Sequence, residues 1–143
     1  MRKLIKVFKE KGFRVAAVKH APHGYELDVE KRDTWQFCQA GADRVMVVGP
    51  KSLTMHHLYN QEPSFDEVCE MVEDVDLILV EGYKSEMGPK VEVVRKGIDD
   101  RPDLGDDLVA VVSDDQLQER VPCFSTESVE QLAEFLIDKL SLK

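Results

Sequence analysis

The segment VDLILVEG, residues 75–82, contains four consecutive apolar residues and ends in a carboxylate and a glycine. A short apolar run with β-branched residues indicates a strand that is covered on both of its faces. Further segments of the same kind are FRVAAVK (13–19), DRVMVVG (43–49) and DLVAVVSD (107–114), with shorter β-rich segments KVEVVRK (90–96) and VPCF (121–124). Strands of this composition are typical of a parallel sheet buried between helices.

Helical patterns alternate with these strands. Residues 2–11 carry apolar residues at helical spacing, but no capping side chain precedes their first turn. Asp33 is predicted to cap a short helix, with Gln36 at the reciprocal position of the capping box. Thr126 is predicted to cap the last helix, which has a continuous apolar stripe.

The middle of the chain has a second capping-box pattern. Ser64 and Glu67 predict the start of a helix over residues 64–74. Residues 52–59 fit either a short edge strand or one turn of helix, and residues 97–107 are predicted to be a surface loop. The sequence therefore predicts a single α/β domain over residues 1–143, with three α/β/α layers and a mostly parallel sheet.

Composition narrows the classes of function. The formal net charge is −9, from 19 basic and 28 acidic residues, which argues against nucleic acid as a partner because duplex binding needs a basic surface. No apolar run approaches the roughly 20 residues that span a bilayer, and no signal peptide is recognisable, so we expect a cytoplasmic protein. Cys38, Cys69 and Cys123 lack the paired spacing of a zinc site and are predicted to be buried apolar residues.

Charged residues follow several of the predicted strands. Ligands of open parallel sheets bind beyond the carboxyl ends of the strands, where this sequence places Lys19, His20, Glu81 and Gly82. A carboxylate at such a strand end has the form of a Walker B acid, which holds Mg²⁺. Lys19 and His20 are candidate phosphate ligands, and Gly82 permits close approach of a phosphate. The alternative is that these residues are solvated strand ends.

The pair Asp114 and Asp115 follows another apolar strand. A carboxylate in this position can accept hydrogen bonds from guanine N1–H and the 2-amino group, although an acidic pair is also common in turns. The adjacent His56 and His57 project to opposite faces of a strand and are interpreted as structural or exposed.

Several segments together resemble the molybdopterin-guanine dinucleotide biosynthesis protein B (MobB) family. The resemblance covers essentially the whole chain. The segments that carry it are KHAPHGYELDVEKRDTW (19–35), AGADRVMVV (40–48), DLILVEGYK (76–84), PKVEVVRKG (89–97), LVAVVSDD (108–115) and VPCFSTESVEQLAEFL (121–136).

This resemblance implies a P-loop-type fold and a GTP-binding protein of molybdenum cofactor maturation, with weak GTPase activity. Such a protein assists a guanylyltransferase partner (MobA) in attaching GMP to molybdopterin, and it forms dimers. By the same resemblance, Glu81 and Gly82 are the Walker B positions with Mg²⁺ at Glu81, Lys19 and His20 lie near the nucleotide, and Asp114 lies near the base. Whether molybdopterin itself binds, and what His23 and Asp28 do, is left open.

One departure from the family pattern concerns phosphate binding. The family begins with an apolar strand and a loop of the form G-x-x-x-x-G-K-[ST], whereas residues 2–11 correspond to the helix after that loop and the 143 residues contain no such motif. Three interpretations follow: a sequence that starts after the loop, a non-catalytic adaptor in cofactor assembly, or another enzyme such as a dethiobiotin synthetase-like ligase or small kinase. The first two interpretations predict that the 143 residues bind GTP poorly.

Overall fold

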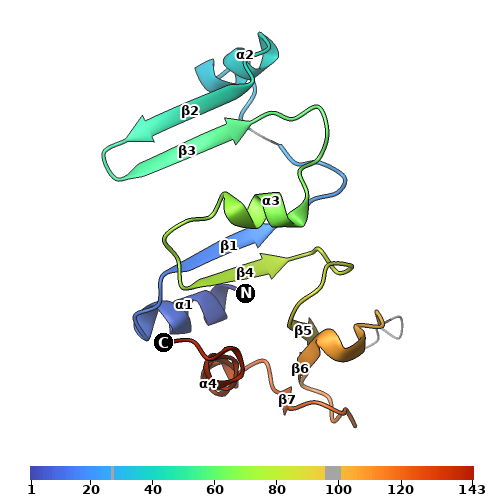
Figure 1. Ribbon diagram of the computed structural model, residues 1–143. Coiled ribbons are helices and arrows are strands. Elements are labelled where there is room, and N and C mark those ends of the chain that lie inside the picture. Colours follow the sequence, from blue (N-terminus) through green and yellow to red (C-terminus); the bar gives the residue numbers. More distant parts are fainter. Residues whose placement is uncertain (27, 96–100) are drawn as a thin grey trace. The chain divides into compact units, whose positions relative to one another are not determined.

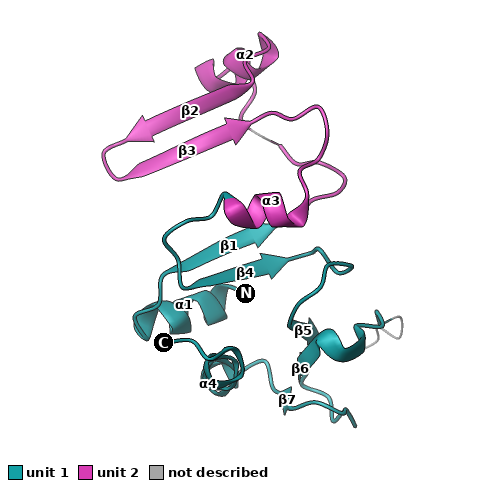
Figure 2. Ribbon diagram, viewed as in Figure 1, with its two compact units in different colours: residues 1–20, 71–143 teal, residues 21–70 magenta. Residues whose placement is uncertain are grey.

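The computed structural model describes residues 1–26, 28–95 and 101–143 of the chain, so part of the loop expected at 97–107 lies outside the described residues. It divides into two compact units, Met1–His20 with Met71–Lys143, and Ala21–Glu70 (Figure 2). The single-domain expectation remains a prediction. Within the described residues, no helix is both long enough and apolar enough to cross a membrane.

The first unit is built on parallel strand pairs (Figure 1). Strand β1 (Val15–Lys19) pairs in parallel with β4 (Leu77–Glu81), and Asp76 holds the start of this pair by accepting hydrogen bonds from the Arg14 backbone and guanidinium. A three-stranded parallel sheet joins β5 (Lys90–Val93), β6 (Leu108–Val112) and β7 (Cys123–Phe124). These pairs confirm the predicted α/β class.

Helices α1 (Arg2–Glu10) and α4 (Val129–Leu140) pack against each other in this unit. Phe8 of α1 is fully buried and meets Phe13 edge to face, with ring centroids 5.9 Å apart. The other buried members of this core come from β6 and α4, namely Val109, Ala110, Leu132, Ala133 and Leu136. Burying these apolar side chains is the main favourable term for folding of the unit.

The second unit corrects the prediction of a second buried strand. It contains α2 (Asp33–Gln39), β2 (Arg44–Gly49), β3 (Ser52–His57) and α3 (Phe65–Glu70). Strands β2 and β3 form an antiparallel hairpin, which resolves residues 52–59 as a strand. Val45 is the one buried residue of β2. The β2–β3 sheet has only two strands, and too little of the unit packs on it to cover both faces.

Two predicted helix caps are wrong and one is confirmed. Helix α4 begins after Ser128, so Thr126 does not cap it, and Asp33 is the first residue of α2 rather than its cap. Ser64 and Glu67 do form the reciprocal capping box: the Ser64 amide and hydroxyl donate to the Glu67 carboxylate, and the Glu67 amide donates to the Ser64 hydroxyl. The two hydrogen bonds that Ser64 donates, the amide bond first, lower the pKa of Glu67.

Candidate functional site

The carboxyl ends of β1 and β4 bring four of the predicted site residues together. Lys19 and Glu81 are register partners in the parallel pair, and the Lys19 amino group lies 3.3 Å from the Glu81 carboxylate. The two side chains remain 73% and 56% exposed, so water screens their attraction and either group can exchange the other for a ligand.

Gly82 continues the β4 strand end in a conformation that favours glycine. Its φ is +97°, and a Cβ at this position would lie 2.8 Å from the Cβ of His20. The His20 amide donates to the Glu81 carbonyl at 2.8 Å, which extends the β1–β4 ladder by one hydrogen bond. The absence of a side chain at position 82 thus lets the two strand ends approach each other closely.

His20 has an aromatic neighbour that the sequence did not reveal. Its ring stacks on that of Tyr83, with centroids 4.1 Å apart and planes 12° from parallel. Tyr83 follows Gly82 and is itself in the left-handed region, with φ +50°. The stack orients the imidazole at the strand end, next to the left-handed turn at residues 82 and 83.

Asp114 lies after β6, and its carboxylate is hydrogen-bonded to another residue of the protein. Its carboxylate accepts hydrogen bonds from the Thr126 amide at 2.8 Å and from the Thr126 hydroxyl at 2.8–2.9 Å. These bonds, the amide bond first, lower the pKa of Asp114 below its ordinary value. Thr126, which was expected to cap α4, therefore ties the loop after β7 to the end of β6. Within the described residues, no hydrogen bond or ion pair joins Asp114 to the Lys19–Glu81 pair.

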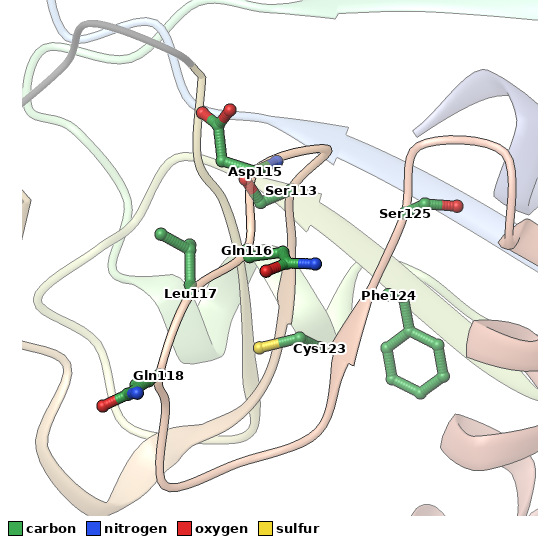
Figure 3. Close-up of a pocket in the computed structure, with 8 residues that line it drawn as sticks. All are labelled: Ser113, Asp115, Gln116, Leu117, Gln118, Cys123, Phe124 and Ser125. Carbon is green, nitrogen blue, oxygen red and sulfur yellow. Dashed lines mark hydrogen bonds between the residues drawn. The ribbon is translucent and has the colours of Figure 1, made fainter.

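A cavity of about 510 Å³ lies beside this loop (Figure 3). Asp115, adjacent to Asp114, lines it, and its backbone amide donates to the buried Ser113 hydroxyl. The rest of the lining is mostly polar and comes from the loop after β6 and from β7, with residues Ser113, Gln116, Leu117, Gln118, Cys123, Phe124 and Ser125. Cys123 is exposed and Cys38 and Cys69 are half-buried, which corrects the expectation of buried cysteines.

The residues present fit a nucleotide-bound Mg²⁺ only in part. No group of three or more His, Cys, Asp or Glu in the described parts of the chain could enclose a metal ion. Mg²⁺ commonly takes one or two protein carboxylates and completes its octahedron with water and phosphate oxygens. Glu81 can supply one such carboxylate, and Lys19 a point charge for phosphate.

Comparisons with known proteins agree on one family. The family profile described as "MobB: Molybdopterin guanine dinucleotide synthesis protein B" matches residues 1–114. The chain is 28% identical over 148 aligned positions to the "Molybdopterin-guanine dinucleotide biosynthesis adapter protein" of Escherichia coli (strain K12), covering 96% of this chain and 83% of that protein.

Solved structures show the same fold. A crystal structure of molybdopterin-guanine biosynthesis protein B (mobB) superposes with a TM-score of 0.75 at 24% identity, covering 98% of this chain and 88% of that one. The MobB protein homolog from Bacillus stearothermophilus gives a TM-score of 0.70 at 24% identity, with coverage of 99% and 87%. The family profile spans most of the chain, and this chain therefore belongs to the MobB family.

Proposed function

We propose that this protein is an accessory protein of molybdenum cofactor biosynthesis that presents a guanine nucleotide to a guanylyltransferase partner. The observation that carries the proposal is the Lys19–Glu81 pair at the ends of two parallel strands, followed by the left-handed Gly82. Family membership supports the pathway, since the related proteins are named for the synthesis of molybdopterin guanine dinucleotide.

The nucleotide phosphates are assigned to the ends of β1 and β4. Lys19 would neutralise phosphate charge, and Glu81 would hold Mg²⁺ together with water and phosphate oxygens. Gly82 leaves room for the close approach of the strand ends, and His20, oriented by its stack on Tyr83, would donate to a phosphate oxygen. Separating Lys19 from Glu81 costs little because the pair is exposed.

The guanine end is assigned to the loop after β6. Asp114 fixes this loop through Thr126, while Asp115 lines the neighbouring cavity. A carboxylate matches the adjacent N1–H and 2-amino donors of guanine, which adenine does not offer. We expect Asp114→Asn and Asp115→Asn to relax the preference for guanine over adenine nucleotides. An unchanged preference in both variants would remove this loop from base reading.

The affinity for GTP is expected to be low in these 143 residues. They contain no G-x-x-x-x-G-K-[ST] segment, so the usual amide cradle, lysine and Mg²⁺-binding hydroxyl for the β- and γ-phosphates are not among them. Titration calorimetry of the 143-residue chain with GTP and Mg²⁺ should give binding weaker than micromolar. Micromolar binding would show that the remaining groups suffice.

The partner and the assembly are proposed on the same basis. We expect the protein to raise the rate at which a MobA-like guanylyltransferase attaches GMP from GTP to molybdopterin. We also expect it to act as a cytoplasmic homodimer. One face of the β2–β3 hairpin supports self-association, because the register pairs Met46 with Met55 and Val48 with Leu53 on that face, and all four side chains are exposed. A guanylyltransferase assay with and without the protein tests the proposal; an unchanged rate would contradict it.

A further inference from the structure

The second unit contains a polar cavity of about 630 Å³ that none of the roles above uses. Its lining comes from the loop before α2, the start of α2 and one face of the hairpin, with residues Asp28, Arg32, Asp33, Thr34, Val47, Thr54 and His56. Val47 and Thr54 are register partners, and His56 pairs with Val45 on the same face. The cavity and the exposed apolar face are thus opposite sides of the hairpin.

Hydrogen bonds within the protein fix the orientation of the Asp28 carboxylate in this cavity. Asp28 is half-buried, and its two carboxylate oxygens accept hydrogen bonds from the Val29 amide, at 2.7 Å, and from the Thr34 hydroxyl. The Thr34 hydrogen bond is the main reason that the pKa of Asp28 lies below its ordinary value. Each carboxylate oxygen can accept a second hydrogen bond, so Asp28 offers two adjacent acceptors in a set direction.

Two side chains that can donate hydrogen bonds, Arg32 and His56, line the same cavity as Asp28. His56 is half-buried, and within the described residues neither its ring nor the Arg32 guanidinium has a hydrogen-bond partner. Arg32 and His56 both act electrostatically on Asp28. Val47 adds an apolar surface on the hairpin wall. The volume falls within the range of about 300–1,000 Å³ that is typical of small-molecule sites.

This combination selects one kind of ligand. Two adjacent acceptors match two adjacent donors, such as the ring N–H and the amino group of a 2-amino-4-oxopyrimidine. The apolar wall suits the face of a flat ring, and the Arg32 guanidinium and a ring N–H of His56 can donate to an anionic substituent on it. Pterins and guanine nucleotides both carry this edge, whereas a metal ion or a simple anion would leave Asp28 or Arg32 without a match.

We propose that this cavity binds the 2-amino-4-oxopyrimidine ring of a pterin or guanine nucleotide, with Asp28 reading the donor edge and Arg32 and His56 holding an anionic substituent. The inference rests on the proposed function, which supplies both kinds of compound, but it concerns a different unit from the Lys19–Glu81 site.

The experiment is a fluorescence anisotropy titration of pterin-6-carboxylate with the full chain. We expect saturable binding that Asp28→Asn weakens by about tenfold or more, because a charged hydrogen-bond pair is lost. The control Asp66→Asn changes an exposed Asp of the same unit outside the cavity and should bind as the wild type does. Lumazine-6-carboxylate, in which oxygen replaces the 2-amino group, should bind more weakly than the pterin.

A second variant keeps the test decisive if Asp28→Asn fails to fold. Arg32→Gln changes an exposed side chain and should weaken pterin-6-carboxylate more than unsubstituted pterin. Competition with GMP separates the two sources, since displacement at comparable concentration indicates a nucleotide site and no displacement indicates a pterin site. Absence of binding by either compound, or binding that Asp28→Asn and Arg32→Gln leave intact, overturns the proposal. None of these outcomes tests the proposed nucleotide site in the other unit, which is tested separately with Glu81→Gln.

Discussion

Gly82 and His20 are in a contact that only glycine permits, because a Cβ at position 82 would lie 2.8 Å from the His20 Cβ and 3.3 Å from its carbonyl oxygen. The contact holds the ends of β1 and β4 close together, directly after the Lys19–Glu81 pair. It links the backbone of the predicted phosphate site to the orientation of the His20 ring, which stacks on Tyr83.

Gly82→Ala should therefore destabilise the protein more than a matched glycine substitution. Gly12 has nearly the same φ, +94°, and a Cβ there would meet nothing within 4 Å. We expect Gly12→Ala to lower the free energy of unfolding by about 1–2 kcal/mol through backbone strain, and Gly82→Ala by about 1–3 kcal/mol more through overpacking. Urea denaturation of both variants measures the difference, and equal losses would show that His20 moves aside freely.

Glu81→Gln should separate metal binding from folding. The Lys19–Glu81 pair is exposed, so its loss should change the free energy of unfolding by less than about 1 kcal/mol. The measurement is an NMR spectrum in the presence of GTP, with Mn²⁺ as a paramagnetic substitute for Mg²⁺. In the wild type, we expect the amide signals of His20 and Gly82 to broaden. In Glu81→Gln, we expect this broadening to be lost. Equal broadening in both proteins would remove Glu81 from the metal role. Glu10→Gln, on α1, serves as the control.

Asp114 should make a pH-dependent contribution to stability. Its pKa is lower in the folded state than the ordinary value of 3.8 because of Thr126, so the folded protein binds fewer protons at this group than the unfolded chain. The contribution is present above pH 3.8 and is lost as the pH falls through the folded value.

Thermal melts of wild type and Asp114→Asn measure this contribution. The wild type should melt at a higher temperature at pH 7, and the difference should shrink well below pH 3.8. Thr126→Val, which removes the hydroxyl but keeps the amide, should show a smaller loss with the same pH dependence. A constant difference between wild type and Asp114→Asn at all pH values would refute the Thr126 interaction as its cause.

Val48→Lys should weaken self-association. Val48 is 73% exposed on the apolar face of the hairpin, and a buried lysine without a partner would oppose an interface there. Sedimentation equilibrium should show a dimer for the wild type and a shift toward monomer for the variant. Val93→Lys changes a valine of the other unit that is also exposed, at 60%, and this variant should remain dimeric. A dimer of unchanged strength in Val48→Lys would place the interface elsewhere.

Local sequence patterns predicted much of the first unit. The apolar strands at residues 13–19 and 75–82 and the amphipathic last helix all rest on side-chain periodicity, which a single segment carries by itself. The Ser64–Glu67 capping box was predictable for the same reason, because its hydrogen bonds join residues three positions apart.

Other features depended on partners far away in the sequence. The segment 43–49 reads as a buried strand, but its hairpin with β3 leaves most of it exposed. Thr126 reads as a helix cap, but its hydroxyl and amide bind Asp114, twelve residues away. Polar groups take whichever partner the fold brings nearest, and composition does not encode that choice.

The amino-acid sequence by itself determined most of the strands and helices, the family to which they belong, and the carboxylate at the end of β4. Only the tertiary structure decided that Lys19 faces Glu81, that His20 needs a glycine at position 82, and that Asp28, Arg32 and His56 surround one cavity. The physical reason is that periodicity and capping are short-range properties of the chain, whereas strand register and side-chain pairing arise when distant segments are brought into contact.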